Sequence, residues 1–140
     1  MRALIAGTEQ VFKWAMFDRP SLETWTRGRV TLLGDAAHPM MPFMGQGAAQ
    51  SIEDGFVLAR CLVADRDDPQ RAMNAYAARR RERTAALQAA SREAGRSLQA
   101  SDPDEVAARN ALMRDNPDAQ VALGFDWVWG YDVESAFADG

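Results

Sequence analysis

The apolar residues change their spacing along the chain, from short runs near its start to helical periodicity after residue 46. Residues 11–17 (VFKWAMF) are rich in aromatic and branched side chains and predict a strand. Residues 30–35 (VTLLGD) predict a fully buried strand that brings the Asp35 carboxylate to its C-terminal edge. From Gln46 to about Leu62, apolar residues recur at intervals of three and four, which predicts an amphipathic helix. Its expected buried stripe consists of Ala48, Ile52, Phe56, Ala59, Leu62 and Val63.

A second and longer helix is predicted over residues 70–98, with Asp68 as its cap and Pro69 in its first turn. One side of this helix is weakly apolar and rich in small residues, so we expect it to lie flat against other structure. The helix also carries a cluster of basic residues, namely Arg79, Arg80, Arg81 and Arg83. Because these arginines spread around most of the circumference, we favour a solvated helix face with local ion pairs over a binding patch.

The two ends of the chain carry weaker signals. Residues 1–6 predict the end of a helix. Ser101 or Asp102 is expected to cap a third helix that ends near residue 115. The segment 125–132 (FDWVWGYD) is densely aromatic, and we expect it to dock against the rest of the chain because a free tail would not carry such residues.

Composition narrows the classes of protein to consider. The 140 residues are 47% hydrophobic and 26% charged, which is ordinary for one globular domain. The net charge of -4 argues against a general nucleic-acid binder, and no apolar run approaches the length of a membrane span, so we expect a cytoplasmic protein. With one cysteine, Cys61, and one histidine, an ordinary Cys/His zinc site is excluded and no metal is expected. Cys61 lies on the apolar side of its predicted helix, which favours an inert core thiol.

The loop between the predicted buried strand and the first helix has the composition of a ligand-binding segment. Pro39 and Pro42 fix φ and remove two backbone donors, so the loop can form an apolar wall. Gly45 and Gly47 open the helix, where the backbone can approach a flat ligand closely and present free N–H groups to it. Together with Asp35, these residues predict a ligand cradle.

The residues of this cradle match a known family. The matching positions are Gly34–Pro39, Pro42, Gly45–Ala48, Glu53–Asp54 and Leu58–Ala59. In this order they resemble the second flavin-binding motif of class A FAD-dependent aromatic hydroxylases, and within that group the salicylate hydroxylase and 3-hydroxybenzoate 6-hydroxylase branch. Residues 14–20, 76–83 and 126–132 resemble the same branch, so the resemblance spans nearly the whole chain.

The resemblance implies an α/β or α+β fragment, the C-terminal portion of a glutathione-reductase-like FAD/NAD(P)-binding fold, mostly helical with a few strands. Residues 1–25 would end the substrate-domain sheet, 26–63 would form the flavin-binding segment, and 64–140 would be a C-terminal helical region. The G-x-G-x-x-G turn that binds the FAD pyrophosphate is not present, since Gln50 stands where its third glycine would be. The chain is therefore expected to be the last third or so of such an enzyme, and inactive alone.

The resemblance also implies roles for individual residues. Asp35 would hydrogen-bond the ribityl chain of FAD, and Pro42 would lie against the isoalloxazine ring. Met41, Phe43 and Met44 would line the space between the flavin and a small aromatic acid, which is hydroxylated with NAD(P)H and O2. The N–H groups at the start of the helix would face flavin N1 and C2=O, where about half a positive charge favours the reduced, anionic flavin. The expected cofactor-binding residues are Gly34, Asp35, Pro42, Gly45, Gln46, Gly47 and Ala48.

Three alternatives stay open from the residues themselves. His38 is a weak candidate for a catalytic base, although we favour a structural or flavin-edge role for it. The chain could instead be a non-catalytic binding or assembly module that complements a separate N-terminal flavoprotein half. A hydrolase built from Ser51, His38 and Asp35 is disfavoured because no G-x-S-x-G turn is present. As a fragment, the chain is expected to expose apolar faces and to self-associate through them.

Overall fold

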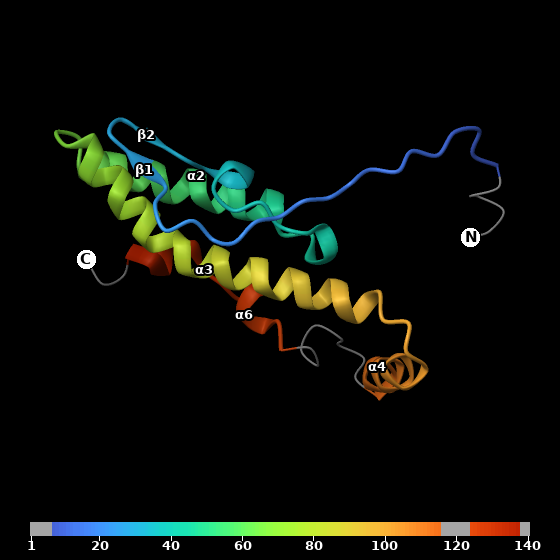
Figure 1. Ribbon diagram of the computed structural model, residues 1–140. Coiled ribbons are helices and arrows are strands. Elements are labelled where there is room, and N and C mark those ends of the chain that lie inside the picture. Colours follow the sequence, from blue (N-terminus) through green and yellow to red (C-terminus); the bar gives the residue numbers. More distant parts are fainter. Residues whose placement is uncertain (1–6, 116–123, 138–140) are drawn as a thin grey trace.

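Two long helices packed side by side dominate the computed structural model, which describes residues 7–115 and 124–137 (Figure 1). Helix α2 spans Gly47–Ala64 and helix α3 spans Pro69–Leu98. The remaining elements are strands β1 (Thr26–Arg27) and β2 (Val30–Thr31), 3-10 helices η1 (Gly34–Ala36), η2 (Pro42–Met44) and η3 (Val133–Phe137), and helices α4 (Pro103–Asp115) and α6 (Asp126–Trp129). The expected fold class, mostly helical with a few strands, is confirmed. No helix in the described ranges is long and apolar enough to cross a membrane.

The predicted helices and their caps are confirmed. The Asp68 side chain accepts a hydrogen bond of 3.0 Å from the Arg71 N–H, and Pro69 begins α3. The Asp102 carboxylate accepts from the N–H of Glu105 at 3.1 Å, so Asp102 is the cap of α4. Capping and proline placement act within one turn of the chain, which is why the sequence alone locates these boundaries. The helix end predicted over residues 1–6 lies outside the described residues.

The predicted strands are wrong in extent and burial. Residues 11–17 form no strand, and Figure 1 shows this blue segment running away from the helices. The predicted buried strand is reduced to the two residues of β2, which pairs antiparallel with β1, and Val30 is 67% exposed. A strand needs a neighbouring strand to satisfy its backbone groups, and the described part of the chain supplies only this short hairpin.

The predicted buried stripe of α2 is also wrong. The residues that α2 buries are Gln50, Asp54, Val57 and Cys61, whereas Ile52 is 74% exposed and Val63 is 59% exposed. The inner face of α2 is thus polar in its first half and apolar in its second half. Gln50 and Asp54 are buried because they meet a charged partner on α3, and a pattern that counts only apolar residues cannot detect such a face.

An apolar core fills the space between the second half of α2, the start of α3 and the hairpin. It consists of Trp25, Ala37, Val57, Cys61, Ala72, Tyr76 and Ala77. Cys61 is 3% exposed, which confirms that its thiol lies in the core, and burial raises the pKa of this thiol, which disfavours the reactive thiolate.

The aromatic segment near the C-terminus docks as predicted. Val128 of α6 is buried, and Figure 1 shows α6 and the following red segment packed back along α3. Arg83 of α3 donates hydrogen bonds to the backbone oxygens of Trp127 at 3.2 Å and Val128 at 3.1 Å. Its guanidinium also lies 3.6 Å from the centroid of the Tyr131 ring. Arg83 thus joins the segment to α3 by two hydrogen bonds and a cation–π contact, in addition to the burial of Val128.

Candidate functional site

A hollow of about 380 Å³ lies at the N-terminal end of α2. Its lining is Asp35, Met40, Met41, Pro42, Gly45, Gly47, Ala48 and Ser51. The structure therefore brings together six residues that the sequence predicted for the site, from η1, the proline loop and the first turn of α2. The Asp35 side chain is exposed at this hollow, so its carboxylate is available to a ligand.

The first turn of α2 lacks a cap of its own. Gln46 is the N-cap residue and makes no side-chain cap hydrogen bond, and the first turn carries no acidic residue. The N–H groups at the start of a helix have no acceptor within the helix and carry partial positive charge, so this end suits an electron-rich ligand atom. The N–H of Gly45, by contrast, donates to the Pro42 oxygen at 3.1 Å. The available donors therefore begin at Gln46.

Gly45 allows the chain to turn into α2. Its φ of +64° is left-handed, a conformation that other residues adopt at a cost, and no atom lies within 4 Å of the position that a Cβ would take. Glycine is needed here for its backbone conformation rather than for close packing. A substitution at Gly45 would strain the backbone beside the hollow.

Gly34 and Gln46 face the interior rather than the hollow. A Cβ on Gly34 would lie 2.6 Å from Ser51 Oγ, and the φ of Gly34 is +59°. The Gly34 N–H donates to Asp54 Oδ2 at 3.0 Å, while the buried Gln46 side chain accepts from Gln50 Nε2 at 3.2 Å. The side chain of Gln46 thus supports the turn, which leaves its backbone N–H as the group that a ligand could contact.

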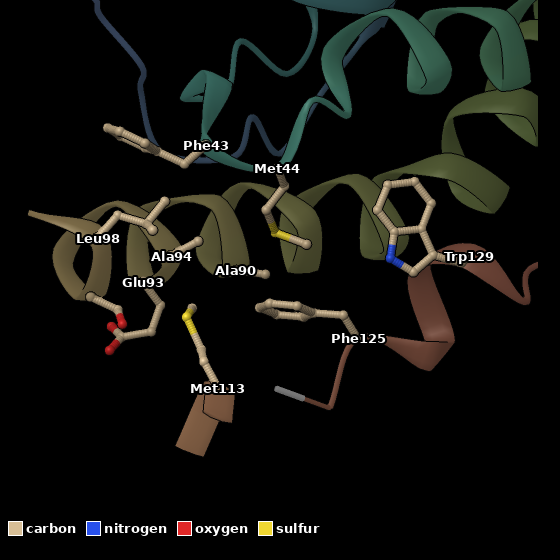
Figure 2. Close-up of a pocket in the computed structure, with 10 residues that line it drawn as sticks. Phe43, Met44, Ala90, Glu93, Ala94, Leu98, Met113, Phe125 and Trp129 are labelled. Atoms are coloured by element: carbon tan, nitrogen blue, oxygen red, sulfur yellow. The ribbon is translucent and has the colours of Figure 1, made fainter. Parts of the chain in front are cut away.

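Phe43 and Met44 line a different cavity from Met41 and Pro42. Figure 2 shows Met44 directed towards Phe125, with Trp129 beside it, Met113 below and Phe43 on the other side of the α3 ribbon. These residues line a groove of about 530 Å³. The floor of the groove is formed by small residues of α3, Ala90 and Ala94. A Cβ on Gly95 would lie 2.5 Å from the Phe43 ring, so the glycine makes room for that side chain. Residues 41–44 thus form a partition with an apolar side chain on each face.

His38 lines neither cavity. Its ring is 1% exposed, lies 5.4 Å from the Trp25 ring between centroids, and places Nε2 at 2.6 Å from Asp54 Oδ2. An ionised carboxylate only accepts, so Nε2 carries the hydrogen. Ser51 donates to the Gly47 oxygen at 3.0 Å, so Ser51, His38 and Asp35 do not assemble into a hydrolase triad.

A buried ionic network joins α2 to α3 below the hollow. Arg80 is fully buried and donates to Asp54 Oδ1 at 2.8 Å, Glu53 Oε2 at 2.7 Å and Gln50 Oε1 at 2.7 Å. Arg83 donates to the same Glu53 oxygen at 3.0 Å. The expectation of a solvated arginine face is therefore wrong for Arg80, because two carboxylates compensate its charge in the interior.

The pKa values in this network follow from its contacts. Burial by itself would raise the pKa of Asp54, but hydrogen bonds from His38, Arg80 and the Gly34 N–H outweigh it and hold the pKa below its ordinary value. Burial likewise opposes ionisation of Glu53, and its hydrogen bond to Arg83 and the charge of Arg80 keep its pKa lowered. Both groups are thus carboxylates at neutral pH.

Sequence reasoning missed this network as a unit. Its signal was present, because Gln46, Gln50, Glu53 and Asp54 recur at helical spacing and Arg80 lies within the weakly apolar side of the long helix. Polar residues at helical spacing are also typical of a solvated face. Only the packing of α2 on α3 distinguishes the two interpretations.

Comparisons with known proteins identify the family. The FAD binding domain family matches residues 4–91. The chain is 41% identical over 133 residues to 6-hydroxynicotinate 3-monooxygenase from Pseudomonas fluorescens, covering 95% of this chain and 29% of that protein. It is 37% identical over 141 residues to salicylate hydroxylase from Pseudomonas putida, covering 99% of this chain and 31% of that protein. The chain thus spans less than a third of the length of these relatives.

A solved structure supports the same assignment. Klebsiella pneumoniae HpxO, in complex with FAD and uric acid, superposes with a TM-score of 0.70 at 30% identity, over 77% of this chain and 28% of that one. The predicted resemblance to the flavin-dependent hydroxylases is confirmed, and with it the assignment of FAD as the cofactor of this family. On the match over residues 4–91, the chain belongs to the FAD binding domain family.

Proposed function

We propose that this chain supplies the ribityl and pyrimidine side of the FAD site in a flavin-dependent monooxygenase. The observation that carries the proposal is the hollow in which the exposed Asp35 carboxylate and the uncapped first turn of α2 meet. The Asp35 carboxylate accepts hydrogen bonds from ribityl hydroxyls, and the N–H groups of Gln46, Gly47 and Ala48 donate to the pyrimidine edge. Met41 and Pro42 provide an apolar wall for the ring system.

The residues present fit that part of FAD on physical grounds. A carboxylate can only accept hydrogen bonds, which suits hydroxyl groups, and a helix N-terminus suits oxygen and nitrogen atoms that gain negative charge on reduction. Gly47 has no side chain that could stand between the Asp35 carboxylate and the start of α2, where a Cβ would lie 3.8 Å from Asp35 Oδ1. When bound, FAD supplies the redox chemistry with NAD(P)H and O2. This chain's residues bind the cofactor, orient it and exclude water from one face.

The substrate that we propose is a small phenolic acid such as salicylate or 3-hydroxybenzoate. Support comes from the names of the relatives, which act on salicylate and 6-hydroxynicotinate. Apolar side chains on both sides of the loop add to it, Met41 at the hollow and Phe43 and Met44 at the separate groove. We assign no catalytic base within this chain. The buried His38 stays a weak candidate because its ring lines neither cavity.

The proposal includes the remainder of the flavoprotein as a partner. We assign residues 1–25 to the end of a substrate-domain sheet, 26–63 to the flavin-binding segment and 64–140 to a C-terminal helical region. Residues 11–17 support this division, because Phe12, Trp14 and Phe17 are 64%, 79% and 82% exposed and need an apolar surface to cover them. We place the assembled protein in the cytoplasm.

A chimera tests the proposed function. The last third of Pseudomonas putida salicylate hydroxylase is replaced by this chain, and bound FAD is measured from flavin absorbance after purification. We expect a yellow protein whose FAD affinity falls at least tenfold in the Asp35→Asn variant. The exposed Asp67→Asn on the same chain is the matched control and should retain the affinity. A colourless chimera, or equal affinity in both variants, would contradict the proposal.

A second candidate function is a non-catalytic assembly module. The exposed aromatic residues 11–17 favour it, because they form a ready surface for a separately made N-terminal half. Co-expression of this chain with such a half should then restore the yellow colour without a covalent link. If only the covalent chimera binds FAD, the assembly module is ruled out.

A further inference from the structure

The Asp54 carboxylate is a point at which three segments meet beneath the proposed flavin site. Its Oδ2 accepts from the Gly34 N–H at 3.0 Å and from His38 Nε2 at 2.6 Å, and its Oδ1 accepts from Arg80 Nε at 2.8 Å. The side chains of Asp54 and Arg80 are fully buried. Each donor thus reaches the carboxylate without competition from solvent, which strengthens all three contacts.

The position of Gly34 is sensitive to this contact. Gly34 has a φ of +59° and lies so close to Ser51 that a Cβ would meet its hydroxyl at 2.6 Å. Glycine adopts this conformation without strain but is also free to leave it, so the hydrogen bond from its N–H to Asp54 and the close packing on Ser51 fix the peptide plane. Asp35 follows directly in the chain, and its side chain is exposed at the hollow. A shift of Gly34 would move the Asp35 carboxylate relative to the first turn of α2.

We propose that Asp54 is a positioning residue for the flavin site, which holds Gly34 and His38 from below and thereby sets where the Asp35 carboxylate stands. The consequence for FAD affinity rests on the proposed function, in which Asp35 is the ribityl ligand. Asp54 itself lines neither cavity and acts only through its neighbours.

To position Gly34 and His38, residue 54 must carry a carboxylate, and a side chain of the same size does not suffice. Three N–H donors converge on two oxygens, and an asparagine offers one oxygen together with an NH2 group that would face a donor. At least one buried donor would then lose its acceptor, whether on Gly34, His38 or Arg80. Asp54 stays ionised at neutral pH because these same donors lower its pKa despite burial.

The test uses the full 140-residue chain with ¹⁵N labelling and needs no activity. In the free protein, the Gly34 amide shift and its hydrogen-exchange protection report the turn, and FAD titration reports the site. We expect Asp54→Asn to move the Gly34 amide, lower its protection at least tenfold and raise the FAD dissociation constant about tenfold. Asp35→Asn should raise the dissociation constant while leaving the Gly34 amide where it is.

A stability control separates positioning from general weakening. Val57→Ala removes buried apolar atoms one turn further along α2, where the side chain is fully buried and has no polar atom that could join the hydrogen bonds to Asp54. We expect this variant to lower the unfolding free energy but to leave both the Gly34 amide and the FAD dissociation constant unchanged. An equal effect of Val57→Ala and Asp54→Asn on FAD would overturn the inference.

Other outcomes are equally decisive. The inference fails if Asp54→Asn leaves the Gly34 amide unchanged, or moves it without any loss of FAD affinity. If Asp54→Asn does not fold, His38→Leu removes one of the two donors on Oδ2 and should move the Gly34 amide and weaken FAD about threefold. No change in either quantity would again overturn it. Absence of FAD binding by the wild-type chain and by the chimera would reject the proposed function, while the Gly34 shifts would still decide whether Asp54 fixes the turn.

Discussion

Two regions of the molecule depart in opposite ways from the rule that charged side chains lie outside and apolar side chains inside. They are the junction between α2 and α3 and the outer apolar surface. We define the junction as Gln50, Glu53, Asp54, Arg80 and Arg83. We define the outer apolar surface as the exposed apolar side chains of two separate segments, Phe12, Trp14 and Phe17 before β1 and Ile52 and Val63 on α2. The junction buries charges, whereas the outer surface exposes large apolar side chains. The difference teaches that the junction is complete within this chain, because every charge in it has a partner, whereas the outer apolar surface has nothing covering it among the described residues.

The junction should dominate stability, and Arg80→Ala is the strongest way to break it. Removing Arg80 leaves the buried Asp54 and the half-buried Glu53 without the cation that they share, which we expect to lower the unfolding free energy by about 3–5 kcal/mol. Urea unfolding followed by circular dichroism measures this. Arg96 is also paired, with Glu93 at 3.0 Å, but both side chains are at least 70% exposed. Arg96→Ala should change stability by less than about 1 kcal/mol, and similar losses for both variants would contradict the contrast.

Acid should weaken the junction specifically. Asp54 and Glu53 have ordinary pKa values of 3.8 and 4.5, and both pKa values are lowered in the fold. A carboxyl with a depressed folded pKa contributes stability above its unfolded pKa and loses it as pH falls through the folded value. The unfolding free energy should therefore fall steadily below about pH 4.5.

The acid effect has its own control. In Asp54→Asn, the fall in unfolding free energy with acid should be shallower, since one of the two titrating groups is absent. Asp67→Asn, an exposed change, should leave the slope as in the wild type. The prediction is wrong if the slope of stability against pH is the same in all three proteins.

Arg83→Lys should lower the stability of the junction by less than Arg80→Ala does. Lysine keeps the charge but loses the fork that contacts Glu53 at 3.0 Å and two backbone oxygens of α6, and it stacks less well on Tyr131. We expect a loss of about 1 kcal/mol and faster hydrogen exchange within α6. Arg96→Lys is the matched control. Unchanged exchange in α6 would show that other contacts hold the segment.

Changes in the outer apolar surface should affect association rather than stability. We expect the wild-type chain to self-associate at micromolar concentration through residues such as Phe12, Trp14 and Phe17. Replacing all three by serine should shift sedimentation towards the monomer and alter the unfolding free energy by less than about 0.5 kcal/mol. Lys13→Ser in the same segment controls for sequence change alone. A monomeric wild type would remove the basis of this prediction.

Local chemistry explains which parts of the fold could be predicted from the sequence. The caps at Asp68 and Asp102 and the extents of α2 and α3 depend on residues within one or two turns, so the sequence located them. The loop residues Asp35, Pro42 and Gly45 indicate the family from the sequence alone, because their order and spacing are specific to its flavin-binding motif. The prediction of a strand over residues 11–17 was wrong. A strand requires a neighbouring strand with which to pair, and the residue types within one segment do not show whether that neighbour is present.

The sequence by itself determined the helices, the glycine and proline loop and the family to which the chain belongs. Tertiary structure alone decided which face of α2 is buried, because the burial of Asp54 depends on Arg80, 26 residues away. It also decided that Phe43 and Met44 face a different cavity from Met41. The physical reason is the same in both cases. A buried charge is tolerated only where a partner from another segment compensates it, and a loop side chain faces whichever element leaves room for it.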